Sequence, residues 1–275
     1  MNRNIRISIL LFLIAALGLG IYFYNNRLNQ DVNILLMGVD SSDQYTHHAD
    51  TIIVVHFAVQ QKKVTFVSIP RDTKVIYRGK SRKINSVYVI NYNIGKYAKA
   101  NNEMLKMAST VIRQKIDYYA QVDYESVEKI VDYYGGVRVN IEQKMYYQDI
   151  AGGLLIDFKP GPRLLNGSDA VKFLRYRKDG NADIGRMERQ QKFMFNLATL
   201  IMQKIDAKNL VSVYSKVSKS INTNFPPDRA VYLFKIFKDY DLHDSSRLIL
   251  PGEAVYEDKQ AYWKVNSLKV KEVFK

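Results

Sequence analysis

Three apolar, β-branched runs near the start of the chain constrain its fold most strongly. The runs "VNILLMGVD", "TIIVVHFAV" and "KVTFVSIP" lie within residues 32–70, and this composition is typical of buried strands. A short polar stretch separates the second run from the third, so these two are expected to form a hairpin. Chemistry in α/β proteins usually lies in loops at strand ends. We therefore expect the strand ends to deliver Asp40, Asp50, Arg71 and Asp72 to loops.

The rest of the chain alternates between helical and strand-like spacing. Helices are expected over residues 101–115 and 124–134, and strands over residues 117–123 and 137–141. This alternation favours a layered α/β domain over an all-α or all-β fold. No internal repeat, low-complexity linker or second boundary interrupts residues 31–275, so we expect them to form one domain.

Further helices are expected in the second half of the chain. One follows a turn, with Asn166 or Ser168 as its cap, and runs into Arg175. A long helix extends from about Ile184 to Ile205, and Pro226-Pro227 suits the start of another. The apolar stripe of the long helix consists of Met187, Met194, Ala198, Ile201 and Ile205.

The first 30 residues form a separate segment. Residues 7–24 carry no charge, and as a helix they would span about 27 Å, close to the hydrocarbon thickness of a bilayer. Arg3 and Arg6 precede this run and only Arg27 follows it, which predicts a cytoplasmic N-terminus and an extracytoplasmic domain. We therefore expect residues 1–30 to be a cytoplasmic stub, a transmembrane anchor and a tether.

A cleaved signal peptide is the alternative for this segment. Ala16, Gly18 and Gly20 offer small residues for a cleavage site. The apolar run is longer than the usual core of a signal peptide, so a retained anchor is favoured. The absence of cysteine from the sequence is compatible with an extracytoplasmic domain that forms no disulfides.

The net charge of +14 predicts an anionic partner. The first 30 residues contribute +3 of this charge, which leaves +11 for the domain. A membrane surface or an anionic glycopolymer suits an outward-facing domain, whereas nucleic acid does not. The alternative is that the scattered lysines serve only solubility or adhesion to a membrane.

The segment "LRYRKDGNADIGRMERQQ" concentrates arginine. Arg186, Arg189 and Gln190 share one helix face near its N-terminus, where cations oppose the helix dipole and repel each other, each at roughly a few tenths of a kcal/mol. A bound phosphate would reverse both effects, because helix N-termini and guanidinium groups bind phosphate oxygens. Arg175 and Arg177, two apart in an extended segment, would approach the same anion from the other side.

An ordinary surface network is an equally supported alternative, in which Asp179, Asp183 and Glu188 neutralise the arginines. The upstream carboxylates favour a phosphate site. Asp40 and Asp50 flank one polar loop, and Mg²⁺ is typically held by one or two carboxylates together with substrate phosphates. Four histidines in a chain without cysteine do not support a zinc site. The combination predicts a diphosphate ligand with Mg²⁺ or another divalent cation.

Seven motifs, taken in order, resemble those of the LytR-CpsA-Psr family: "GVD", "ADTIIVV", "VTFVSIPRDT", "KIN", "VDYYGGVRVNI", "GPRLLNGSDAVKFLRYR" and "DIGRMERQQ". The resemblance covers Val32 to Ile205. It implies a mixed-sheet, layered α/β sandwich that encloses an apolar pocket for a polyprenyl tail. It also implies a membrane-anchored phosphotransferase that moves a glycopolymer, of teichoic-acid, capsule or similar type, from a polyprenyl diphosphate to peptidoglycan or a related wall acceptor through a phosphodiester.

The same resemblance implies roles for individual residues. Asp40 and Asp50 would hold the metal. The catalytic residues would be Asp40, Asp50, Arg71 and Asp72. Which of the three carboxylates acts as the base is left open. The diphosphate ligands would be Arg71, Arg175, Arg177, Arg186 and Gln190, with Lys83 and Asn85 as weaker candidates. The lipid tail would lie against Phe173, Phe193 and Leu197, although a plain core role is the more ordinary interpretation of each.

One departure from the family pattern concerns His48, which stands two positions before Asp50, where the family usually has arginine. A histidine donates to phosphate only when suitably protonated or in the right tautomer. Three other functions stay open: a non-catalytic protein that binds lipid diphosphates or anionic polymer, a hydrolase that releases the polymer to water, and a transcription regulator. The outward-facing orientation disfavours the regulator, and the oligomeric state is left open.

Overall fold

The structure is a computed structural model that describes most of the chain after Arg27. The described residues are 28–40, 47–150, 153–176, 182–206, 208–257 and 259–274, without the side chains of Asp40 and of residues 182–184. Among these residues, no helix combines the length and the apolar character that a membrane crossing requires. The predicted transmembrane anchor, residues 7–24, lies outside the described residues.

A six-stranded mixed sheet forms the centre of the fold. β1 pairs antiparallel with β2 and parallel with β6, and β3 pairs antiparallel with β2 and parallel with β12. The strands in sheet order are β11 (Asn222–Thr223), β6 (Tyr118–Val122), β1 (Val32–Asp40), β2 (His48–Ala58), β3 (Lys63–Ser68) and β12 (Ser246–Ile249). The predicted strands and the predicted hairpin are confirmed. β2 begins at His48, so Asp50 lies inside a strand and not in the preceding loop.

The central strands bury side chains on both faces of the sheet. Leu35 and Met37 of β1 join Ile52 of β2 in one hydrophobic cluster. Ile34 and Ile53, their neighbours in sequence, belong to another cluster on the opposite face. Strand side chains alternate between faces with a period of two, so a sheet with this pattern needs cover on both sides.

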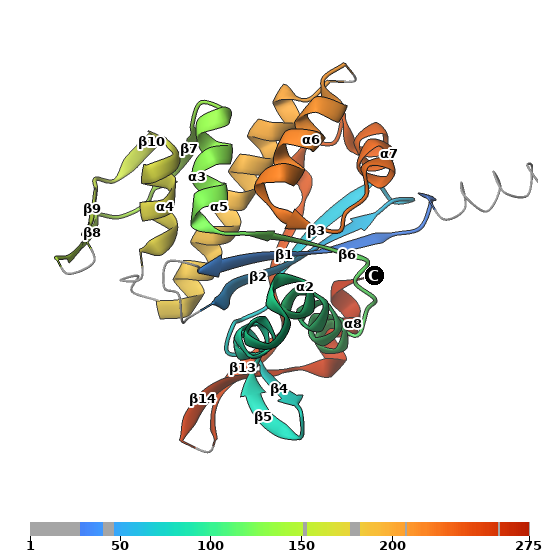
Figure 1. Cartoon of the computed structure of the whole chain (residues 1–275), viewed down its shortest axis with the longest axis vertical. Helices are drawn as coiled ribbons and strands as arrows, with labels where there is room; N and C mark the ends of the chain where they lie inside the picture. The colour runs from blue at the N-terminus through green and yellow to red at the C-terminus, as the bar shows by residue number, and fades with distance from the viewer. Residues whose placement is uncertain are drawn as a thin grey trace, which may run out of the picture.

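Helices provide this cover, as Figure 1 shows. On one side lie α2 (Ile84–Ile112) and α8 (Ser267–Val273). The other side carries α3 (Tyr124–Tyr133), α4 (Gly167–Arg175), α5 (Ala182–Lys204), α6 (Leu210–Ser220) and α7 (Pro227–Phe237). The predicted layered α/β fold with a mixed sheet is therefore confirmed.

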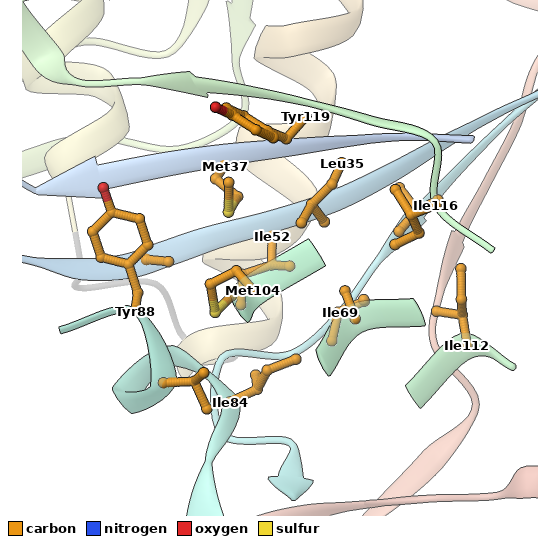
Figure 2. Close-up of a cluster of buried hydrophobic side chains, with 14 of the residues drawn as sticks. Leu35, Met37, Ile52, Ile69, Ile84, Tyr88, Met104, Ile112, Ile116 and Tyr119 are labelled. Carbon is orange, nitrogen blue, oxygen red and sulfur yellow. The ribbon is translucent and has the colours of Figure 1, made fainter. Parts of the chain in front are cut away.

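The cluster beneath the sheet packs α2 against β1, β2 and β3. In Figure 2, Leu35, Met37 and Ile52 face the helix residues Ile84 and Met104, all at most 2% exposed. α2 begins at Ile84, well before the predicted start at residue 101. The helix is kinked at Gly95 (φ −141°) and Lys96 (φ 53°), where the backbone is not helical. This kink breaks the helical spacing that identifies a helix in sequence.

A second group of elements extends beyond the sheet. β7 (Val137–Ile141) pairs with β10 (Gly161–Leu165), and β8 (Met145–Asp149) pairs with β9 (Leu154–Phe158). They share a hydrophobic cluster with α3, α4 and α5. Gly136 ends the α3 segment with φ +99°, where a Cβ would lie 2.9 Å from the carbonyl oxygen of Leu165. Asn166, and not Ser168, caps α4 by accepting from the amide of Asp169 at 2.8 Å.

Two further hairpins lie beyond α2, on the side away from the sheet (Figure 1). They are β4 (Lys74–Tyr77) with β5 (Lys80–Lys83), and β13 (Gly252–Glu257) with β14 (Gln260–Val265). Trp263 joins them to the domain, because its Nε1 donates to the carbonyl oxygen of Leu250 at 3.1 Å and its backbone bridges Thr73. A short 3-10 helix, η1 (Leu242–Asp244), precedes β12.

His56 makes the stability of the fold sensitive to pH. Its Nδ1–H donates to Oδ1 of Asn33 at 2.9 Å. Burial lowers the pKa of His56, against a smaller opposing effect of Asp31. The unfolded chain therefore binds more protons than the folded chain in mild acid, so the free energy of unfolding falls as the pH drops below about 6.5.

We predict that His56→Gln reduces this loss, because glutamine keeps a polar side chain in β2 but does not take up a proton. The free energy of unfolding, measured in urea by circular dichroism at about pH 7.5 and about pH 5.5, is expected to fall less in the variant than in the wild type. An equal fall in both proteins would show that other groups carry the pH dependence.

Candidate functional site

A pocket lies where the parallel strands β1 and β6 end. Its volume is about 60 Å³, and it is lined by residues of β1, β2, β6, α3, α4 and α5. Its polar lining residues are Asp50, Thr51, Asp123, Tyr124 and Gln190. Open α/β sheets bind ligands at the carboxyl ends of their parallel strands. We name this space the strand-end pocket and take it as the candidate site.

Asp50 and Arg71 form an ion pair at this pocket. Nη1 of Arg71 donates to Oδ1 of Asp50 at 3.1 Å, and the two side chains are 26% and 15% exposed, respectively. The pairing of β2 with β3, in which Ile53 lies opposite Ser68, brings the two residues together. Both charged groups are thus held in place and still reach solvent.

The "KIN" motif supports the loop that carries Arg71. The amide of Ile84 donates to the carbonyl oxygen of Thr73 at 2.9 Å, and the amide of Asn85 donates to that of Arg71 at 3.2 Å. The free amides of the α2 N-terminus are therefore capped by this loop. Lys83 forms an ion pair with Asp72 at 3.0 Å. Asp72 is thus held by a residue of the same motif.

The carboxylates fit one mode of Mg²⁺ binding. Asp40 lies opposite His48 in the β1–β2 register, at the same end of the strands as Asp50, and its side chain is outside the described part. No group of three or more histidine, aspartate or glutamate side chains that could hold a metal occurs among the described residues. Mg²⁺ needs only one or two carboxylates when substrate phosphates complete its shell. The partly exposed carboxylate of Asp50 fits that mode and not a closed protein cage.

His48, at the start of β2, is half-buried, and its Nδ1 has no hydrogen-bond partner among the described residues. The structure thus places this histidine beside Asp40 and two residues from Asp50.

Arg186 and Gln190 lie on the first turns of α5 and are 3% and 7% exposed. Gln190 lines the strand-end pocket together with Asp50. Its Oε1 is buried and has no hydrogen-bond partner within the described part of the chain. The alternative from the sequence was a solvated surface network in which acidic residues neutralise the arginines, and the burial of Arg186 does not fit it. Two of those acids, Asp179 and the side chain of Asp183, lie outside the described residues.

Arg189 is committed to the protein interior. It is 8% exposed, its Nε donates to the carbonyl oxygen of Phe173 at 3.1 Å, and its Nη2 donates to that of Tyr176. These bonds join α5 to the end of α4. Its neighbour on the same helix face, Arg186, is therefore the arginine of this face that remains a ligand candidate.

Arg175 is the last residue of α4, so the prediction of an extended segment from residue 175 is wrong at this position. The helix ends there because the next residue, Tyr176, is extended (φ −61°, ψ 133°). The guanidinium group of Arg175 lies 5.6 Å from the ring centroid of Tyr124, a residue of the strand-end pocket. Arg177 lies outside the described residues.

A larger apolar cavity of about 370 Å³ lies between the sheet and the helices α5, α6 and α7. Ile34, Val55 and Phe66 contribute from the sheet, and Ala198 and Ile201 from α5. Leu36 and Ala120 line this cavity and also the strand-end pocket. The two spaces are therefore neighbours. The strand-end pocket is lined by two carboxylates and an amide, and the cavity is almost entirely apolar.

The three residues predicted to lie against a lipid tail do not line this cavity. Phe173, Phe193 and Leu197 are at most 5% exposed and belong to the cluster shared by α3, α4, α5 and β7. The cavity lies against a different face of α5, which carries Ala198 and Ile201. These two residues are part of the apolar stripe seen in the sequence, and the small side chain of Ala198 is the signal that could have identified the face next to a cavity.

The chain belongs to the LytR_cpsA_psr family, whose sequence pattern it matches over residues 22–275. The regulatory protein MsrR of Staphylococcus aureus is 27% identical over 244 residues, which are 86% of this chain and 70% of MsrR. TagU of Bacillus anthracis, named a polyisoprenyl-teichoic acid–peptidoglycan teichoic acid transferase, is 29% identical over 228 residues, which are 82% of this chain and 70% of TagU.

Solved structures share the fold. The crystal structure of TagV from B. subtilis superposes with a TM-score of 0.74 and 23% identity, covering 90% of this chain and 95% of TagV. TagT bound to LIIa-WTA superposes with a TM-score of 0.70 and 20% identity, covering 90% of this chain and 89% of TagT. At these identities the likeness concerns the architecture, a mixed α/β fold around a mixed sheet.

We predict that Arg189→Ala destabilises the protein, because two buried carbonyl oxygens lose their donor. The expected loss in free energy of unfolding is about 2–4 kcal/mol, measured in urea. The matched control is Arg175→Ala, in the same region, which removes only a ring contact and is expected to cost less than about 1 kcal/mol. A loss for Arg189→Ala as small as that of the control would contradict the structural role.

Proposed function

We propose that this protein transfers a glycopolymer, of teichoic-acid, capsule or similar type, from a polyprenyl diphosphate carrier to peptidoglycan or a related wall glycan. The observation that carries the proposal is the apolar cavity of about 370 Å³ that shares Leu36 and Ala120 with the strand-end pocket. A polyprenyl diphosphate has the same division, an apolar tail joined to a charged head. The name of TagU, a teichoic acid transferase, and the LIIa-WTA bound to TagT support this choice of substrate class.

The reaction would form one phosphorus–oxygen bond and break another. A hydroxyl oxygen of the acceptor attacks the phosphorus next to the polymer, the bond to the polyprenyl phosphate breaks, and the hydroxyl proton passes to a carboxylate or to solvent. Arg71, Arg186 and Gln190 would donate to the diphosphate oxygens and stabilise the charge that develops on them. Arg175 and Arg177 are further proposed ligands. Asp50, or Asp40 beside it, would orient the acceptor hydroxyl.

A divalent cation such as Mg²⁺, held by Asp40 and Asp50, would supply charge neutralisation for the diphosphate. The ion pair of Arg71 with Asp50 supports this assignment, because it places a cation and a carboxylate next to each other at the pocket before any ligand binds. Lys83 and Asn85 would act by holding the Arg71 loop and Asp72 in place.

The proposed location is the outer face of a cell membrane. Residues 7–24 would anchor the chain with the N-terminus in the cytoplasm. A tether that ends near residue 30 would keep the domain close to the membrane, where polyprenyl carriers lie. The positive charge of the chain suits an anionic polymer or membrane.

A non-catalytic protein that binds lipid diphosphates is the second candidate, and the name of MsrR, a regulatory protein, favours keeping it. Both candidates require diphosphate binding in the strand-end pocket. They differ in whether a product is formed, so an assay for transfer separates them.

We predict that Asp50→Asn and Arg71→Ala each lower the transfer rate by roughly 10²-fold or more, because each removes a group that would act on the charge of the transition state. The assay incubates the purified full chain in detergent with a lipid-diphosphate-linked sugar, wall glycan and Mg²⁺, and measures the phosphodiester-linked product. Omission of the metal, by chelation, is expected to stop transfer.

The matched control is Arg163→Ala, an arginine of β10 that is 42% exposed and pairs with Asp169 away from the pocket. It is expected to transfer at the rate of the wild type. Sugar released to water in place of a linked product would identify a hydrolase. Donor binding without any product by the wild type would favour the non-catalytic candidate.

We also predict that Ala198→Phe discriminates between donors by tail length, because a larger side chain would occupy the apolar cavity. The apparent affinity for a long-chain polyprenyl donor is expected to fall at least about tenfold, since each CH₂ group that stays in water forfeits about 0.8 kcal/mol. Donors with very short tails should be affected much less. The control Val211→Phe changes an α6 residue that is 69% exposed and lies outside the cavity lining.

A further inference from the structure

A second hollow, of about 600 Å³, lies beside the face of α5 that points away from the strand-end pocket. Its polar lining comes from α5, from β7 with the residues after it, and from the η1–β12 segment. These residues are Glu188, Arg189, Lys192 and Asn196, then Asn140, Glu142 and Gln143, and then His243 and Arg247. A space of this volume is within the range of ligand sites in proteins. Phe173 and Phe193 also line it, but the proposed function places the lipid tail of the donor in the apolar cavity and not in this hollow.

Helix geometry separates this hollow from the proposed donor sites. Gln190, Met194 and Ala198 follow one another at intervals of four along α5, and they line the strand-end pocket or the apolar cavity. Glu188 and Lys192 have the same spacing and line the second hollow. An offset of two residues is a rotation of about 200° around a helix. α5 therefore separates the second hollow on one side from the strand-end pocket and the apolar cavity on the other.

The two sites approach each other at the start of α5. Gly185 lines the second hollow, and the next residue, Arg186, shares a helix face with Gln190 of the strand-end pocket. At this point only the first turn of the helix stands between them. A ligand lying in the second hollow and passing Gly185 would thus bring one of its groups to the proposed diphosphate site.

The charges of the second hollow nearly balance. Lys192 forms an ion pair with Glu142, and Arg189 is held by carbonyl oxygens. Glu188 and Arg247 form no ion pair with any residue that the structure describes, and they contribute one charge of each sign. The guanidinium group of Arg247 rests 4.7 Å from the ring centroid of Phe195, which the ring of His243 meets edge-on at 5.0 Å.

These features define the kind of ligand. The hollow offers hydrogen-bond donors and acceptors fixed on an aromatic ring, without the excess of positive charge that the chain as a whole carries. A polyanion would find little net attraction here. An uncharged chain with many hydroxyl groups would be well matched, because charged side chains form strong hydrogen bonds to neutral partners.

We propose that the second hollow binds the acceptor glycan. This inference rests on the proposed transfer function and adds where the second substrate lies: along the outer face of α5, with the reacting hydroxyl directed past Gly185. The donor would then enter from the sheet side of the helix and the acceptor from the other, so that both can be bound at the same time.

The test separates acceptor dependence from donor dependence in the full chain. Transfer rates of the wild type, Glu188→Ala, Arg247→Ala and the double variant are measured while each substrate is varied in turn. The KM for the acceptor is expected to rise about tenfold or more in the double variant, because hydrogen bonds to charged groups are lost. The KM for the donor should be unchanged. Glu253→Ala, an exposed acid of β13, is the control and should match the wild type.

A direct measurement of glycan binding tests the site even if no transfer can be detected. Glycan oligosaccharides released from peptidoglycan are titrated into the same proteins by calorimetry. Binding by the wild type that weakens in the double variant supports the site even if no transfer occurs, in which case only the proposed function fails. An unchanged acceptor KM and unchanged oligosaccharide binding would overturn the inference and leave the proposed function intact. A rise in the donor KM instead would assign the hollow to the polymer of the donor.

Discussion

The two-sided burial of the central strands is the constraint on which the rest of the structure depends. Because β1, β2 and β3 place apolar side chains on both faces, the chain must supply two layers of cover. The two layers differ in how well they fill the space. α2 packs against one face of the sheet in a closed hydrophobic cluster that includes Leu35 and Met104. On the opposite face of the sheet, α5, α6 and α7 leave an apolar cavity of about 370 Å³. Protein interiors are normally close-packed, so a space of this size in the cover of a sheet is the feature on which the proposed lipid-carrier site rests.

α5 borders all three spaces described above, the strand-end pocket, the apolar cavity and the second hollow. Its sequence meets three environments at once: Gln190 at the strand-end pocket, Ala198 at the apolar cavity, and Glu188 at the second hollow. A helix in this position must be fixed firmly, because a rotation would exchange these surfaces. Arg189 provides one such restraint by donating to the carbonyl oxygens at the end of α4. The arginine-rich segment thus combines a structural residue with ligand candidates, and only the burial and partners of each residue distinguish them.

The sequence predicts those parts of the fold that follow from local periodicity. The strands of the β2–β3 hairpin and the proline start of α7 are predicted correctly. The family resemblance, and not periodicity, assigns Asp50 and Arg71 to one site, and the structure pairs them. The first half of α2 was missed because the kink at Gly95 and Lys96 interrupts the spacing. The lining of the apolar cavity could not be identified from the sequence. Phe193 and Ala198 are both apolar residues of one helix, and periodicity alone does not distinguish the face that packs into a core from the face that borders an open space.

The ion pair of Arg71 with Asp50 shows how the proposed diphosphate site balances its charges within the protein. Arg186 is buried and Arg71 is three-quarters buried, and a charge removed from water is costly unless it is compensated. Asp50 compensates Arg71 at 3.1 Å, and Lys83 and Asp72 compensate each other at 3.0 Å just beside them. A partly exposed ion pair is worth little in net stability, so these pairs can exchange partners at small cost. The proposed site would thereby offer cations to a diphosphate while its charges remain compensated within the protein.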